Sequence, residues 1–210
     1  MLEASEQINA GARRVGSRTL EAGEARTVTI MRHYDAPVAD VWDACTNPER
    51  IPRWFLPVSG ELRDGGRFQV EGNAGGTIER CEPPHSFMAT WEYGGQVSWI
   101  ELRLSEADGG GTRFELEHIA VEGDHWKQFG PAAVGIGWDL GLLGLSGHLA
   151  TGASVSPEEG AAFAATEEGK RFIELSSRGW YEADVAAGAD PSQAAAAAGR
   201  TFGFYTGAGG

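Results

Sequence analysis

The sequence has few cysteines and no segment that resembles an export signal. Only two of its 210 residues are cysteine, Cys45 and Cys81. The N-terminus lacks a basic start, an apolar run and a small-residue cleavage site, which together mark an exported protein. We therefore expect a cytoplasmic protein with reduced thiols, the alternative being a Cys45–Cys81 disulfide in an oxidising compartment.

Basic residues are also scarce. Seventeen lysines and arginines face 30 acidic residues, which gives a formal net charge of -13. Such a surface repels phosphate backbones and anionic lipid heads, so we expect neither nucleic-acid nor membrane binding. The apolar stretch 124–149 contains Asp139 and His148 and has no basic flanks, which argues against a membrane-spanning helix.

Motifs for metal, nucleotide or nucleophilic chemistry are absent. There is no HExxH, paired CxxC, GxSxG, P-loop or strand-linked GxGxxG. Four histidines show no metal-ligand spacing: His33, His85, His125 and His148. Three glutamates on the polar face of the predicted strands form no evident catalytic pair: Glu101, Glu115 and Glu117. We therefore expect no metal and no cofactor.

The centre of the chain reads as an antiparallel sheet. Residues 27–33 have β-branched residues at alternate places, and about six further short runs between Pro57 and Val121 are separated by turn residues. Phe114, Leu116 and His118 alternate with charged residues, as on a strand with one wet face. The pattern predicts a meander of about seven strands.

Helices are predicted on both sides of this meander. Proline-led starts at Asp35-Ala36-Pro37 and Asn47-Pro48-Glu49 indicate two short helices after the first strand. A long helix over 124–149 contains six glycines, which indicates close backbone contact or room for a ligand. Further helices are expected from Ser156 to about Ala187 and from Asp190 to about Tyr205.

Several short sequence motifs, taken in their order along the chain, resemble those of one protein superfamily. They are Asp35-Ala36-Pro37 with Val41-Trp42, Thr46-Asn47-Pro48-Glu49, Trp54-Phe55, Gly65-Gly66-Arg67-Phe68, Glu82-Pro83-Pro84, Thr90-Trp91, Gly111-Thr112-Arg113 and His118. Together they resemble the START-like or SRPBCC superfamily, the fold of birch-pollen-type allergens, in the branch named for homologues of the heat-shock-protein-90 ATPase activator. The resemblance covers residues 27–150.

This resemblance implies an α+β helix-grip fold, a curved antiparallel sheet around a long C-terminal helix. We expect a flexible lead-in over residues 1–25, the helix-grip domain over 26–152 and a helical extension over 153–210 packed on the same domain. The extension lies outside the common pattern. It could cover the sheet edge or mediate a homodimer.

The superfamily uses the space between sheet and helix for small apolar molecules, so the residues expected there are candidate ligand contacts. They are Trp54, Phe55, Phe68, Trp91, Phe114, His118, Val134, Trp138, Leu142 and Leu145. Each could instead be ordinary core, since pocket walls and cores have the same composition. Trp91 and Trp138 are more informative because a buried indole N–H needs a partner.

His118 is the only candidate for proton transfer, although a structural histidine is the simpler interpretation. Asp139 reads as a solvent-facing or structural acid. The leading functional hypothesis is binding of a small hydrophobic or aromatic molecule. One alternative is an enzyme of polyketide cyclase or dehydratase type that uses the same cavity. The other is a co-chaperone-like domain with a chaperone partner.

Overall fold

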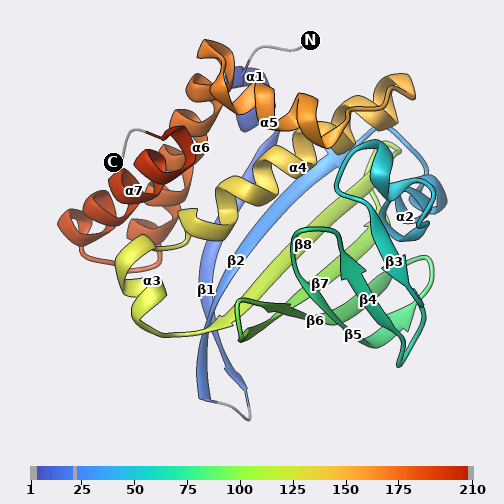
Figure 1. Cartoon of the computed structure of the whole chain (residues 1–210), viewed down its shortest axis with the longest axis horizontal. Coiled ribbons are helices and arrows are strands. Elements are labelled where there is room, and N and C mark those ends of the chain that lie inside the picture. The colour runs from blue at the N-terminus through green and yellow to red at the C-terminus, as the bar shows by residue number, and fades with distance from the viewer. Residues whose placement is uncertain (1–3, 21–22, 208–210) are drawn as a thin grey trace. The chain divides into compact units, whose positions relative to one another are not determined.

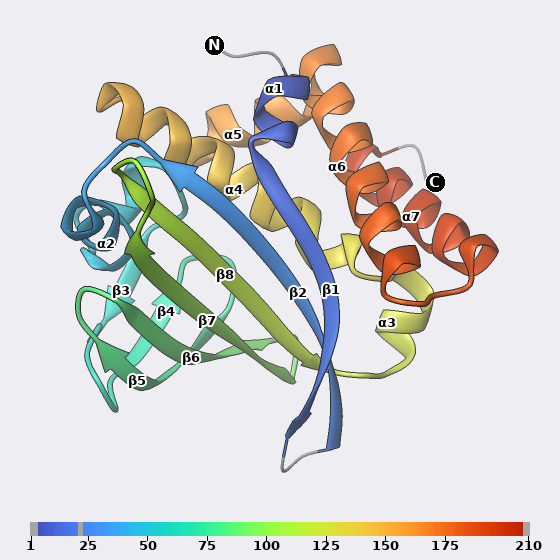
Figure 2. The ribbon, with the colours of Figure 1, turned by 180° about the vertical axis from the view of Figure 1, so that it is seen from behind.

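The computed structural model describes residues 4–20 and 23–207. It contains one eight-stranded sheet with the order β1-β2-β8-β7-β6-β5-β4-β3 (Figures 1 and 2). The strands are β1 (Gly11–Leu20), β2 (Gly23–Tyr34), β3 (Val58–Gly60), β4 (Arg67–Val70), β5 (Gly75–Glu82), β6 (Ser86–Tyr93), β7 (Gln96–Glu106) and β8 (Thr112–Val121). An α+β fold with an antiparallel sheet is therefore confirmed.

Seven α-helices and one short 3-10 helix complete the described part of the chain. They are α1 (Ala4–Asn9), α2 (Val38–Thr46), η1 (Ile51–Arg53), α3 (Asp124–Phe129), α4 (Ala132–Thr151), α5 (Pro157–Ala165), α6 (Glu167–Ala186) and α7 (Pro191–Thr206). None of these helices is both long enough and apolar enough to cross a membrane. The two short helical segments expected after the first strand are α2 and η1.

The chain divides into two compact units. The first comprises Met1–Ile30, Val121–Leu140 and Glu158–Gly210, and the second comprises Met31–Ala120 and Gly141–Pro157. Helix α4 contributes its first half to the first unit and its second half to the second unit. Each unit is described below by itself.

The second unit contains the meander from β3 to β8. Strands that follow one another in the sequence are also neighbours in the sheet, so a short connection joins each adjacent pair (Figure 1). The β7–β8 hairpin turns at Gly109 and Gly110, whose φ angles of 92° and 102° suit glycine. Buried apolar side chains from β7 and β8 form its core: Ile100, Leu102, Leu104, Phe114 and Leu116.

The first unit is mainly helical. Helices α6 and α7 lie side by side in both views (Figures 1 and 2), and Phe172, Ile173 and Trp180 of α6 are buried. Thr166 caps α6 by accepting from the Gly169 backbone N–H, and Asp190 caps α7. The first of these caps divides the single helix expected over 156–187 into α5 and α6.

The strand count differs from the prediction because β1 was expected to be part of a loosely ordered lead-in. In β1 only Val15 is buried, and most of the other residues are arginine, glycine, serine or threonine. A strand at the end of a sheet has one partner strand and much exposed surface, so it carries little hydrophobic signal. The structure corrects the prediction to eight strands, with helix α1 and strand β1 within residues 1–25.

The predicted long helix over 124–149 is also two helices. Gly130 ends α3 with a φ of 63°, and Pro131 follows it. The left-handed glycine ends the helix, and the proline can begin the next one because its missing N–H is not required there. Within the predicted segment, α4 is therefore the long helix, with 20 residues.

Candidate functional site

Strands β6, β7 and β8 place one set of alternating residues on a single face of the sheet, here called the inner face. Three cross-strand rows define it: Phe87, Leu102 and Leu116; Ala89, Ile100 and His118; and Trp91, Ser98 and Ala120. Directly paired residues of antiparallel strands share a face. The predicted grouping of Phe114, Leu116 and His118 on one face is confirmed, and the register adds Phe87, Ala89 and Trp91 to the same face.

Aromatic rings continue along this face. The ring centroids of Phe68 on β4 and Trp91 are 6.3 Å apart, and those of Trp42 on α2 and Phe87 are 6.2 Å apart. Phe68 is buried, whereas Trp42, Phe87 and Trp91 are only half-buried. The inner face therefore presents large aromatic side chains that are not fully packed away.

His118 is the buried imidazole of this face, with 4% of its surface exposed. Its Nε2 lies 3.0 Å from Oγ of Ser98, and the Ser98 hydroxyl donates its own proton to the Trp91 carbonyl, also at 3.0 Å. Because the hydroxyl has one proton, it must accept from His118, so Nε2 carries a hydrogen. Burial lowers the pKa of His118 to about 4, and the ring is neutral at neutral pH.

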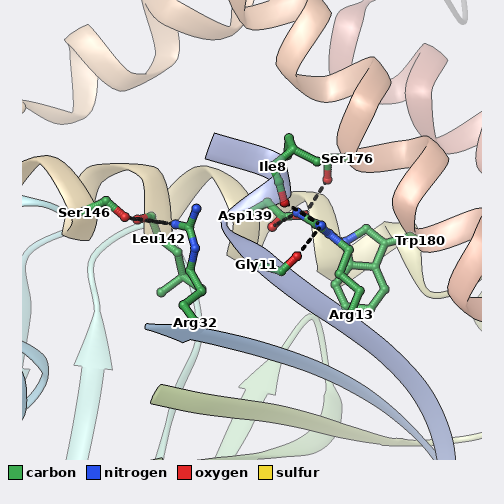
Figure 3. A network of polar contacts seen from close by, with 9 residues as sticks. All are labelled: Ile8, Gly11, Arg13, Arg32, Asp139, Leu142, Ser146, Ser176 and Trp180. Atoms are coloured by element: carbon green, nitrogen blue, oxygen red, sulfur yellow. Dashed lines mark hydrogen bonds and ion pairs between the residues drawn. The ribbon is translucent and has the colours of Figure 1, made fainter. Parts of the chain in front are cut away.

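Strand β2 adds two polar side chains that sequence reasoning missed. Arg32 is 8% exposed, and its Nη1 donates to the Leu142 carbonyl at 3.1 Å and to Ser146 Oγ at 3.0 Å (Figure 3). These bonds join β2 to the second half of α4. The signal was present in the sequence, because Arg32 and Tyr34 continue the alternation of Val28 and Ile30.

Tyr34 lies on the same side of β2 and is 6% exposed. Its ring meets that of Phe114 edge to face, with centroids 5.5 Å apart. Burial raises the pKa of Tyr34 to about 12, against the opposing effect of nearby Arg32. The phenol therefore keeps its proton at neutral pH.

Trp54 and Phe55 pack against the glycines of α4 within the same unit. A Cβ on Gly144 would lie 2.4 Å from the Trp54 carbonyl oxygen, and one on Gly141 would lie 3.4 Å from the Phe55 ring. The Trp54 indole N–H donates to the Ala44 carbonyl at 2.9 Å. Gly141 and Gly144 therefore serve close packing by the chain itself.

Leu142 and Leu145 are buried in the second half of α4. Val134 and Trp138 lie in its first half, which belongs to the first unit, and both are half-buried. Of the ten predicted ligand contacts, the second unit contains eight. Whether any of them touches a ligand stays a prediction.

Asp139 is not solvent-facing, because only 4% of its surface is exposed. It accepts from Arg13 through both oxygens, at 2.7 and 3.0 Å, from Ser176 Oγ at 2.6 Å and from the Trp180 indole at 3.0 Å (Figure 3). Gly135, on the same helix, faces the Trp180 ring. The structural interpretation of Asp139 is therefore correct and the solvent-facing one is wrong.

The glutamates expected on the wet face lie opposite the inner face, but two of them are buried. Glu101 is 3% and Glu117 7% exposed. Arg80 and Arg103 each donate to Glu101, at 2.6 and 2.5 Å, and Arg103 also contacts Glu115 at 2.6 Å. These arginines cover the carboxylates, so alternation predicted the face correctly but not the exposure.

Metal-binding and thiol chemistry have little basis in the described residues. Within 4–20 and 23–207 no group of three or more His, Cys, Asp or Glu side chains could hold a metal ion. Cys45 and Cys81 are free thiols, and burial raises the pKa of the Cys45 thiol to about 12. A hollow of about 520 Å³ beside the β7–β8 hairpin is lined by residues such as Asp35, Val38 and Glu106, none of which was predicted as a ligand contact.

Comparison with known proteins places this architecture in a family. Residues 35–150, more than half of the chain, match the family model "Activator of Hsp90 ATPase homolog 1-like protein". No curated protein matches the chain significantly.

Three solved structures are similar to different extents. The crystal structure of CalU16 from Micromonospora echinospora is 40% identical, with a TM-score of 0.67, over 83% of this chain and 98% of that one. The solution structure of CalU16 gives 39% identity and a TM-score of 0.72, over 85% and 97%. DynU16, a protein of the dynemicin biosynthetic locus, is 22% identical with a TM-score of 0.53, over 61% of this chain and 48% of that one, which shows the fold alone. The chain belongs to the family of Activator of Hsp90 ATPase homolog 1-like proteins, within the SRPBCC superfamily.

Proposed function

We propose that the protein binds a small, largely apolar aromatic molecule on the inner face of the second unit. The observation that carries this proposal is that β4, β6 and β8 each bring aromatic side chains to this face, among which Phe87 and Trp91 remain half-buried. Small-molecule sites are mostly apolar and contain a few placed polar groups. His118 and Tyr34 are such groups, and both are neutral at neutral pH.

One structural relative comes from a biosynthetic locus. DynU16 belongs to the dynemicin biosynthetic locus, and its likeness to this chain is one of fold. The fold alone does not determine function, because functional sites differ between proteins of one fold. The proposal therefore depends on the inner face of this chain.

The contacts of His118 favour binding over proton transfer. Nε2 donates to Ser98, so that nitrogen cannot take a proton from the serine. A histidine whose pKa is about 4 is also a weak base at neutral pH. These contacts argue against acid–base catalysis by His118.

Two tryptophans on neighbouring strands give a matched test. Trp91 lies on the inner face and Trp99 on the opposite face of the sheet, and both are half-buried. Binding of the neutral fluorescent probe N-phenylnaphthylamine is measured by titration and by the rise in Tm that a ligand of the folded state causes. Trp91→Leu should weaken binding about tenfold, corresponding to one lost aromatic contact, whereas Trp99→Leu should leave it unchanged. Failure of the probe to bind, or equal losses in both variants, would reject the proposal.

A further inference from the structure

The Tyr34 hydroxyl is buried and makes no hydrogen bond of good geometry with any described residue, although the Arg32 and Ser146 side chains lie near it. The side chain is 6% exposed, so bulk water does not replace a protein partner. Buried hydroxyl groups are nearly always hydrogen-bonded, and an exception calls for an explanation such as a ligand or an ordered water. The orphaned hydroxyl therefore marks a position where a polar atom belongs.

The surroundings of this hydroxyl define what that atom should be. The Phe114 ring packs edge-on against the Tyr34 ring, which makes one side apolar. Arg32 and Ser146 lie close to the phenol, and both influence its titration. Arg32 is fixed there by its bonds to the Leu142 carbonyl and to Ser146 (Figure 3). The hydroxyl therefore lies between an aromatic surface and a fixed positive charge.

The protonation state of the Tyr34 phenol determines whether its hydroxyl donates or accepts the missing hydrogen bond. Tyr34 keeps its proton at neutral pH, so it is able to donate. A positive charge beside a donor favours an acceptor with negative charge, since charge-assisted hydrogen bonds are stronger than neutral ones. Carboxylate, sulfonate and phenolate oxygens meet this requirement.

We propose that Tyr34 and Arg32 form an anchor for an anionic oxygen of the bound molecule, so that the ligand is an aromatic acid or phenolate rather than a neutral hydrocarbon. This inference rests on the proposed function. The aromatic part of the ligand lies along the inner face and its charged oxygen accepts from the Tyr34 hydroxyl. Tyr34 and Arg32 set the ligand class, and the aromatic rings contribute most of the contact.

Two fluorescent probes that differ by one charged group test this anchor on the full-length protein. Anilinonaphthalene sulfonate and N-phenylnaphthylamine share an aromatic skeleton, and only the first carries an anionic oxygen group. The wild type should bind the sulfonate about tenfold more tightly, as expected for one charge-assisted hydrogen bond. Tyr34→Phe should remove most of this difference and leave the Kd of the neutral probe within about twofold.

The test needs a check on folding and a control variant. Tyr34→Phe removes only a hydroxyl that makes no hydrogen bond of good geometry, so it should fold, and near-UV circular dichroism checks that it does. Tyr205→Phe also removes a phenolic hydroxyl, but this one donates to the Ala133 carbonyl at 3.0 Å within the first unit. It should leave the preference for the sulfonate probe unchanged.

The outcomes separate this inference from the proposed function. If both probes bind with equal affinity, or if Tyr34→Phe leaves the preference for the sulfonate intact, the anchor is rejected and the apolar site stands. Unchanged probe binding together with a lower Tm in Tyr34→Phe would show that the hydroxyl stabilises the fold and would also reject the anchor. If neither probe binds, both proposals fail.

Discussion

Arg50 donates a hydrogen bond from Nε to Nε2 of His148, at 3.2 Å. The other ring nitrogen, Nδ1, lies 2.9 Å from the Ala153 carbonyl. A carbonyl only accepts and a guanidinium only donates, so the ring is neutral with its proton on Nδ1. Arg50 also contacts Asp40 and Asp43, at 2.7 and 2.9 Å. His148 thus ties the end of α4 to the segment that follows α2.

Replacement of His148 by leucine should lower the free energy of unfolding by about 1–3 kcal/mol, because it leaves buried hydrogen-bonding groups unsatisfied. His148 is 4% exposed. The exposed histidine His85 provides the control, and His85→Leu should change stability by less than about 0.5 kcal/mol. Urea unfolding measures both, and equal effects would show that the Arg50 contact contributes nothing.

The glycines of α4 allow a second prediction on a single helix. A Cβ at Gly135 would lie 2.3 Å from atoms of the Trp180 ring, whereas one at Gly147 would meet no atom within 4 Å. Gly147→Ala should therefore stabilise the protein by up to about 1 kcal/mol through helix propensity. Gly135→Ala should destabilise it by about 1–3 kcal/mol through overpacking. Thermal unfolding of the two variants tests this, and changes of the same sign would contradict it.

The glycines also show what the sequence could not reveal. Their number in a helix indicated a special environment, but Trp180 lies 45 positions after Gly135, and only the folded chain brings the two together. Strand alternation, in contrast, is a local property. It correctly grouped Phe114, Leu116 and His118, because side chains two apart on a strand share a face.

The exposure of a side chain was harder to predict than the face of the sheet on which it lies. Glu101 was placed on the correct face, yet it is 3% exposed because Arg80 and Arg103 reach across from neighbouring positions. Long arginine side chains cover a surface that alternation alone assigns to water. Arg32 shows the converse, a charged residue at an inward position of β2 whose partners, Leu142 and Ser146, lie more than 100 residues later.

The third prediction concerns the buried carboxylate of Asp139. Asp139→Leu leaves the buried Arg13 guanidinium without its bidentate partner, so the free energy of unfolding should fall by about 3–5 kcal/mol. Adding Arg13→Met removes the stranded charge and should recover part of the loss. Urea unfolding of the two single variants and the double variant gives the coupling energy. A double variant as unstable as the sum of the single variants would show that the two residues act independently.

The fourth prediction is a pH dependence of stability caused by His118. Its pKa is lowered from 6.5 to about 4 by burial, so the unfolded chain binds a proton in a pH range where the folded chain does not. Stability should therefore be highest above pH 6.5 and fall as the pH drops from about 6.5 to about 4, with a contribution from His118 of about 3 kcal/mol.

Comparison with His118→Gln isolates this contribution, because glutamine does not titrate and its amide can still donate to Ser98. The free energy of unfolding, measured in urea across the acid range, should fall less steeply for His118→Gln than for the wild type. His85→Gln removes an exposed histidine and should keep the wild-type slope. Parallel pH profiles for wild type and His118→Gln would mean that the imidazole titrates alike in the folded and unfolded chain, which contradicts a buried, neutral His118.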